Sequence, residues 1–90
     1  MIELHGTLLC QTDAEVDAVR VHLSEHIQLT RAEPGCLRFD VEQSADPMVW
    51  TVFEQFESRA AFDAHQARTA ASRWVVATAG IERRYEIREL

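Results

Sequence analysis

The feature that most constrains this chain is a hydrophobic period that switches repeatedly between strand and helix spacing along 90 residues. Residues 2–10 alternate in polarity, as expected of a half-buried strand. Helical spacing follows in the apolar side chains Val16, Val19, Leu23 and Ile27. The chain is therefore predicted to begin with a strand and then a helix.

The residues that flank this first helix indicate where it begins and where it ends. Thr12 and Glu15 have the spacing of a capping box, in which each side chain accepts a hydrogen bond from the other residue's backbone amide. The helix is thus predicted to begin at Thr12 or Asp13. It is predicted to end near Ala32, because residues 33–35 read Glu-Pro-Gly, which favours a turn.

Two strands and a second helix account for most of the remaining chain. Residues 37–42 alternate and residues 48–57 form another apolar strand, with a polar run between them. Ser58 is a candidate cap for a helix that is interrupted around residues 68–70 and ended by Gly80. A last strand is predicted from the alternation of residues 81–87.

The resulting order, β-α-β-β-α-β, predicts a ferredoxin-like α+β fold with an antiparallel sheet and both helices on one face. Residues 48–57 carry large apolar side chains on both parities, so the second face of the sheet also needs cover. Exposing apolar surface costs about 25 cal/mol per Å². We therefore expect a homodimer that packs sheet against sheet.

Length and composition limit the number of domains and the classes of molecule that the chain can bind. Ninety residues predict one domain, residues 1–90, and 47% hydrophobic residues indicate a globular core. A net charge of -6 argues against nucleic acid and anionic membranes as partners. Cys10 and Cys36 form no Cys-x-x-Cys motif, and the first residues do not read as a signal peptide or a membrane span, so a cytoplasmic protein is predicted.

Four segments together resemble the antibiotic biosynthesis monooxygenase family. They are residues 30–36 (Thr-Arg-Ala-Glu-Pro-Gly-Cys), the strand of residues 50–54 with Phe56, residues 60–65 (Ala-Ala-Phe-Asp-Ala-His) and the pair 84–85 (Arg-Tyr). The resemblance spans nearly the whole chain. It implies ferredoxin-like domains that pair into a dimeric α/β barrel.

The resemblance also implies an activity. We expect a cofactor-independent monooxygenase that uses dioxygen to oxidise a small aromatic phenol, quinol or polyketide-like compound to a quinone. The alternative is a non-catalytic dimeric ligand-binding or interaction domain, and the family also contains haem-degrading enzymes and an isomerase. No nucleotide, flavin or metal motif is present, and the helical position of the haem ligand in relatives falls near residues 72–74, Ser-Arg-Trp, which offer no good iron ligand.

His65 is the predicted catalytic residue. On a helix it projects between Ala61 and Phe62, toward the sheet, and it matches the helical histidine of the family. An imidazole enclosed in a cavity can take a proton from a bound phenol and leave an anion that reacts with dioxygen. The alternative is a core histidine bonded to a backbone carbonyl.

Aromatic side chains are predicted to wall a flat substrate pocket, although each can equally be core: Trp74, Trp50, Phe39, Phe53 and Tyr85. Trp50 can also lie in the dimer interface.

Polar candidates complete the predicted substrate site. His5 lies where some haem-degrading relatives contact their ligand, and Arg38 or Arg83 can steady an anionic intermediate. His22 and His26 stand one helical turn apart, but no third ligand is evident. We therefore predict no metal site and interpret this pair as a solvated flank of the helix.

Overall fold

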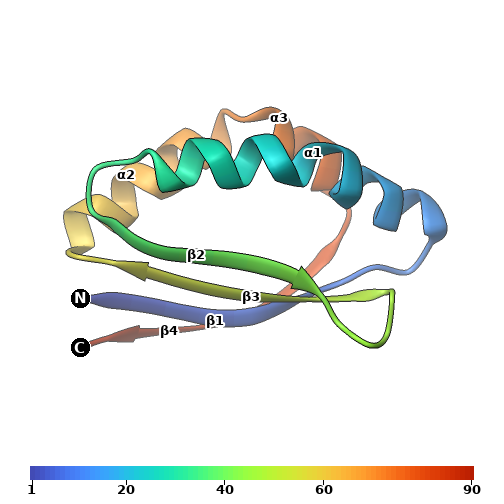
Figure 1. Ribbon diagram of the computed structural model, residues 1–90, viewed down its shortest axis with the longest axis horizontal. Helices are drawn as coiled ribbons and strands as arrows, with labels where there is room; N and C mark the ends of the chain where they lie inside the picture. The colour runs from blue at the N-terminus through green and yellow to red at the C-terminus, as the bar shows by residue number, and fades with distance from the viewer.

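A computed structural model describes residues 1–90 and contains four strands and three helices: β1 (Ile2–Leu9), α1 (Asp13–Arg31), β2 (Cys36–Gln43), β3 (Val49–Phe56), α2 (Arg59–Ala70), α3 (Arg73–Thr78) and β4 (Glu82–Glu89). The strands form one antiparallel sheet in the order β2-β3-β1-β4. The helices all lie on one face of it (Figure 1). The predicted ferredoxin-like α+β fold is confirmed, with the second predicted helix divided into α2 and α3.

Side-chain caps set the helix boundaries. Thr12 accepts a hydrogen bond from the amide of Glu15, as predicted, but the Glu15 carboxylate accepts from the amide of Gln11, one residue before the expected partner. α1 ends at the turn where Gly35 has a φ of 84°, a conformation that favours glycine. Ser72 caps α3 through the amide of Val75, which explains the interruption after α2.

The strand register places one row of side chains beneath the helices. On β1 and β3 the pairs Leu4–Glu54 and Leu8–Trp50 face inward together. Glu54 is therefore an acidic side chain within an otherwise apolar row. A bulge between Cys36 and Arg38 in β2 leaves Leu37 exposed, although alternation alone would bury it with Phe39.

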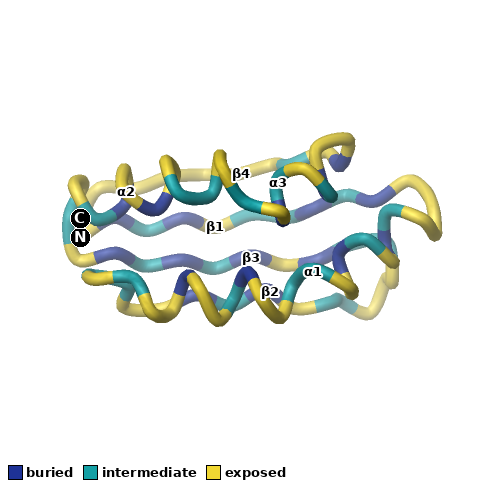
Figure 2. The backbone as a smooth tube through the Cα atoms, turned by 90° about the horizontal axis from the view of Figure 1, so that it is seen from above, coloured by how far each residue is buried: buried dark blue, intermediate teal, exposed yellow.

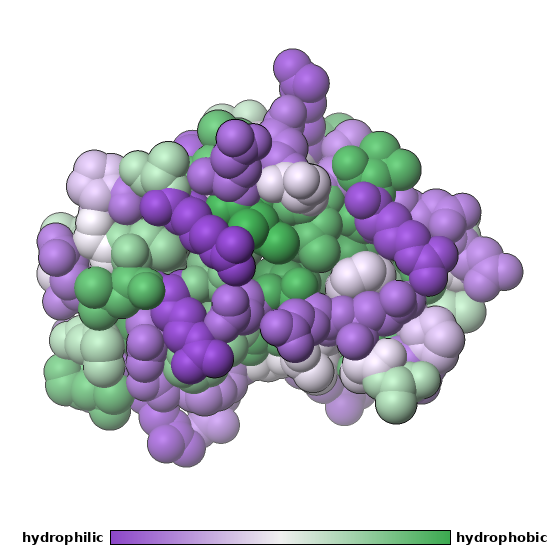
Figure 3. All heavy atoms as spheres, viewed as in Figure 1, coloured by the Kyte–Doolittle hydropathy of each residue, from purple (hydrophilic) through white to green (hydrophobic).

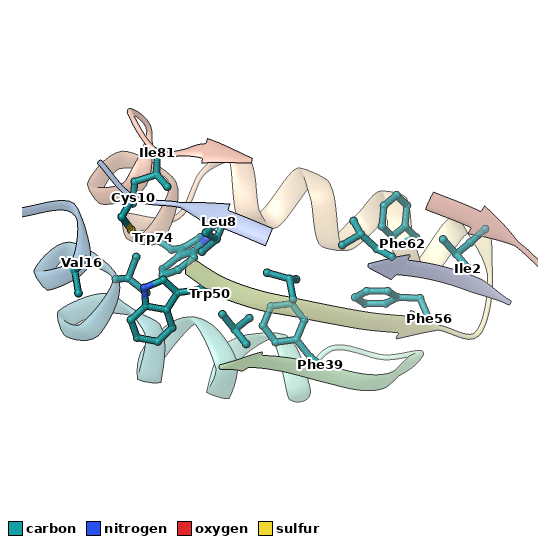
Figure 4. Close-up of a cluster of buried hydrophobic side chains, with 14 residues drawn as sticks. Ile2, Leu8, Cys10, Val16, Phe39, Trp50, Phe56, Phe62, Trp74 and Ile81 are labelled. Atoms are coloured by element: carbon teal, nitrogen blue, oxygen red, sulfur yellow. The ribbon is translucent and has the colours of Figure 1, made fainter. Parts of the chain in front are cut away.

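The core lies between the sheet and the helices. Seen from above, α1 runs over the β2 side of the sheet, and α2 and α3 run over the β1 and β4 side (Figure 2). Side chains from both layers meet between them (Figure 4), and hydrophobic atoms remain visible between the layers in the edge view of Figure 3. Fourteen buried apolar residues form this core, and Phe56, Leu8 and Val19 have no exposed surface.

The two ends of the chain lie at one corner of the sheet (Figure 1). The amide of Leu90 donates to the carbonyl of Met1 at 2.8 Å, and the Met1 ammonium donates to the carbonyl of Leu90 at 3.0 Å. The neighbouring strands β1 and β4 are thus paired to their ends. None of the helices has the length and apolar character that a membrane span requires.

Candidate active site

His65 projects from α2 into the space between the helices and the sheet, as its position on the helix predicts. It is 2% exposed, and its ring lies 4.8 Å from that of Phe56 and 5.7 Å from that of Phe39, measured between centroids. The imidazole is therefore held among aromatic rings, with its two nitrogens in different surroundings.

One nitrogen of His65 is fixed by a charged network at the end of α1. Nδ1 lies 2.7 Å from Oε1 of Glu33, whose Oε2 accepts a hydrogen bond from Nε of Arg68 at 2.7 Å. Arg68 also donates to the hydroxyl of Thr30 at 2.9 Å. The network ties the turn after α1 to α2 and orients the His65 ring.

The network assigns the proton on His65. The Glu33 carboxylate only accepts, so Nδ1 carries the hydrogen and Nε2 is an acceptor, with the hydroxyl of Thr69 at 3.4 Å. Burial lowers the pKa of His65 below its usual value, although Glu33 opposes this change. The resting imidazole is accordingly neutral, with Nε2 as an acceptor.

Glu54 approaches His65 from the sheet. Its Oε1 lies 3.7 Å from Nε2 of His65 and has no hydrogen-bond partner. Only 6% of Glu54 is exposed, and burial, with the nearby charge of Glu33, raises the pKa of its carboxyl group to about 7. At neutral pH the neutral acid is therefore well populated.

His26 is a further buried titratable group, and it corrects one prediction. It is 4% exposed and stacks on Trp74, so it is not part of a solvated flank. Its Nδ1 has no partner, and burial, followed by the charges of Arg68, His65 and Arg83, lowers its pKa to about 3. Helical spacing had paired His26 with His22, but α1 turns it toward α3.

A cavity of about 340 Å³ joins these groups. Its lining combines buried acid–base groups with aromatic and aliphatic walls: Leu4, His26, Glu54, His65, Gln66, Thr69, Ala70, Trp74, Val75, Arg83 and Tyr85. A volume of this size suits a small ligand. Small-molecule sites typically combine apolar walls with a few convergent polar groups.

Gly6 and Tyr85 shape the sheet side of the cavity. They are paired in the register of β1 and β4, and a Cβ atom at Gly6 would collide with the Tyr85 ring and with the carbonyl of Arg84. The absence of a side chain at Gly6 lets Tyr85 lie against the backbone of β1. Arg83 is held in turn by hydrogen bonds to Thr78, through both the hydroxyl and the carbonyl.

The structure brings together only some of the predicted site residues. Trp74 and Tyr85 line the cavity with His65, and Phe39 contacts the His65 ring from β2. Trp50 lies in the core opposite Leu8, and its indole nitrogen has no hydrogen-bond partner.

Three other predicted residues lie together on the opposite face of the sheet. The Arg38 guanidinium lies 4.4 Å from the centre of the Phe53 ring, and His5 packs edge-on against the same ring at 4.5 Å. His5 also contacts Glu3 at 2.7 Å. The sheet separates this cluster from His65, so the two groups cannot act on one small ligand within a single chain.

Sequence reasoning overlooked Glu33, Glu54 and Arg68. Glu54 shared a parity with Trp50 and Phe56, and an acidic residue in an inward-facing row is a detectable signal. Arg68 follows His65 by three positions, so it lies near the same face of a helix. Glu33 was interpreted only as part of a turn, and nothing local in the sequence indicates its contact with His65.

The sequence of this chain matches a known class of protein. The family model described as antibiotic biosynthesis monooxygenase matches residues 1–77. The chain therefore belongs to this family, as its motifs and its ferredoxin-like fold indicated.

Particular relatives agree in fold. A solved structure titled "Putative antibiotic biosynthesis monooxygenase from Nitrosomonas europaea" is 25% identical, with a TM-score of 0.85 over 99% of this chain and 97% of that one. The structure of Rv0793 from Mycobacterium tuberculosis is 26% identical, with a TM-score of 0.76 over 99% and 93% of the two chains. The same protein, named "Putative monooxygenase Rv0793", is 43% identical over 49 residues, which are 54% of this chain and 48% of that relative.

Proposed function

We propose that this protein is a cofactor-independent monooxygenase that oxidises a small aromatic phenol, quinol or polyketide-like compound to a quinone. The observation that carries the proposal is the geometry of His65. Glu33 fixes Nδ1, so Nε2 is available as a base at a cavity with aromatic walls. The family assignment and the names of its relatives support the same reaction class.

The proposed reaction begins with proton transfer. Nε2 of His65 takes the hydroxyl proton of the phenol, and the electron pair stays on the substrate oxygen. Glu33 stabilises the imidazolium that forms. The electron-rich phenolate then supplies the electrons that reduce dioxygen. With a phenol or an anthrone, one oxygen atom enters the product as the second quinone carbonyl and the other leaves as water. A quinol already carries both quinone oxygens, so there the inserted atom becomes a ring hydroxyl of the quinone and the other again leaves as water.

Oxygen uptake by the purified protein tests this function. Hydroquinones, naphthoquinols and anthrones are supplied in turn, without added metal or flavin. We expect uptake with at least one compound, slowed about 10²-fold or more in His65→Ala. His22→Ala, a half-buried histidine that does not line the cavity, is the control.

Each outcome has a definite meaning. An unchanged rate in His65→Ala would remove that residue from the mechanism. Quenching of tryptophan fluorescence by the same compounds without oxygen uptake would favour the alternative function, a ligand-binding domain. In that case Trp74, which lines the cavity, is the expected reporter.

The homodimer is part of the proposal. Phe53, Leu9 and Val49 are only half-buried on the face of the sheet that no helix covers. Burying this face against a second copy would remove apolar surface from water. The predicted cytoplasmic location stays a prediction.

A further inference from the structure

Glu54 has a buried carboxyl group for which the fold gives no structural reason. It is surrounded on β3 by the inward side chains Val52 and Phe56, and its Oε1 makes no hydrogen bond. A buried polar atom without a partner destabilises the folded chain, and residues retained at such a cost are often functional. The unpartnered oxygen belongs to the lining of the cavity.

The groups that face Glu54 favour its neutral form. No cation contacts its carboxylate, and Nε2 of His65, a neutral acceptor, lies 3.7 Å from its Oε1. Glu33, near the same histidine, adds a like charge. The other charged or titratable groups at this cavity come from α1 and β4, namely His26, Arg83 and Tyr85. The Arg83 guanidinium is already engaged by Thr78 and the carbonyl of Ile81.

The distance between Glu54 and His65 leaves room for one ligand atom. Oε1 and Nε2 are 3.7 Å apart, which is too far for a good hydrogen bond between them. An oxygen placed about 2.8 Å from each atom closes a triangle with ordinary hydrogen-bond lengths. A single hydroxyl oxygen can therefore contact both side chains at once.

We propose that Glu54 is a second catalytic residue, which as a neutral carboxylic acid donates a hydrogen bond to the phenolate oxygen that forms when His65 takes the substrate proton. This inference rests on the proposed function. The O–H bond of the phenol breaks, an N–H bond forms at Nε2, and the electron pair remains on oxygen. That oxygen then accepts from two donors, the imidazolium and the Glu54 carboxylic acid.

This arrangement keeps the charges of the site balanced. Glu33 faces the new imidazolium, and the phenolate faces a neutral acid and a cation. An ionised Glu54 would instead repel the phenolate at short range. Binding of a phenolate should consequently weaken as pH rises and Glu54 loses its proton.

Binding of 4-nitrophenol tests the proposal without any oxidation. The ionised form of this probe absorbs visible light, so its protonation state in the cavity can be read directly. In the wild-type protein the bound probe should be ionised at about pH 6, and its dissociation constant should rise about tenfold or more between about pH 6 and pH 8.5.

Two variants separate the possible roles of Glu54. Gln keeps a neutral donor, so Glu54→Gln should bind the ionised probe at about pH 6 like the wild type. It should weaken less than the wild type at high pH, because only the proton that the probe gives to His65 is then lost. Met has similar length but no donor, so Glu54→Met should bind the ionised probe about 10–100-fold more weakly. Asp63→Asn, which removes an exposed carboxylate from α2, is the control for charge.

Several results would overturn the proposal. One is equal affinity of Glu54→Met and the wild type for the ionised probe. Another is an equal loss of affinity in Glu54→Gln and Glu54→Met. The third is a wild type that does not bind the probe. If one of the two variants does not fold, the comparison of the other with the wild type decides the matter. A Glu54 effect on probe binding without oxygen uptake would reject only the oxygenase function. Uptake that needs His65 but not Glu54 would reject only this inference.

Discussion

The imidazole of His26 stacks on the indole of Trp74, with 4.7 Å between ring centroids and 4° between ring planes. This contact joins α1 to α3, and both rings line the cavity together with His65. It buries a titratable ring that has no partner for Nδ1. Protonation of His26 is consequently costly in the folded chain.

Acid should unfold the protein partly through His26. The folded-state pKa of His26, about 3, lies below the 6.5 of a free histidine, so the unfolded chain binds the extra proton as pH falls from 6.5 toward 3. Up to about 3–5 kcal/mol of stability should be lost over this range. Urea unfolding should show that His26→Phe loses much less stability on acidification than the wild type does. His22→Phe should lose as much stability as the wild type.

Glu54 should change the stability with pH in the direction opposite to that of His26. Its folded-state pKa, about 7, lies above the ordinary 4.5, so the contribution of the neutral acid is complete below pH 4.5 and is lost as pH rises through 7. Glu54→Gln should therefore be more stable than the wild type by about 1–3 kcal/mol at pH 8 and similar to it at pH 4.5. Thermal and urea unfolding at both pH values measure this. Equal differences at the two pH values would mean that folding does not shift the pKa of Glu54.

The Glu33 network should matter for both stability and orientation. Glu33→Gln removes the charge that Arg68 and His65 share, and Arg68 is only partly exposed, so the free energy of unfolding should fall by about 2–3 kcal/mol. Nitrogen NMR of His65 should then show mixed tautomers in place of one. Glu25→Gln is a suitable control, because its pair with Arg73 spans 3.9 Å between exposed side chains and should contribute under about 1 kcal/mol.

A charge at Phe53 should separate the proposed dimer. Phe53→Glu places a carboxylate on the face of the sheet away from the helices, beside Asp40 across the register with β2. Sedimentation velocity should show a monomer, with the helix content unchanged. Val76→Glu, at a residue that is 80% exposed on α3, should leave the assembly intact. A monomeric wild type would refute the sheet-to-sheet pairing.

The fold could be predicted from the sequence because each helix and strand has its own hydrophobic periodicity and its own capping or turn residues at its ends. Thr12, Ser58 and Gly35 act at their predicted boundaries. The placement of Leu37 was not readable, because it depends on a bulge in the pairing of β2 with β3, and pairing is not a local property.

The residues of the candidate site could be predicted from the sequence only in part. The position of His65 on its helix predicted its inward direction, which the structure confirms. Its partner Glu33 is 32 residues away in sequence, and the contact exists only because the turn after α1 meets α2. Parity assigned Phe53 and Trp50 to opposite faces of the sheet, but could not indicate which face the helices cover. The substrate role of Phe53, His5 and Arg38 accordingly stays a prediction.

The pairing of Met1 with Leu90 makes a circular permutant of this chain feasible. A short linker can join the two ends at their shared corner without crossing either face of the sheet. New ends can then be opened in the polar connection between β2 and β3, at residues 44–48, none of which lines the His65 cavity. In such a permutant β4 and β1 become a continuous hairpin, so the strand that carries Tyr85 would form early and through local contacts.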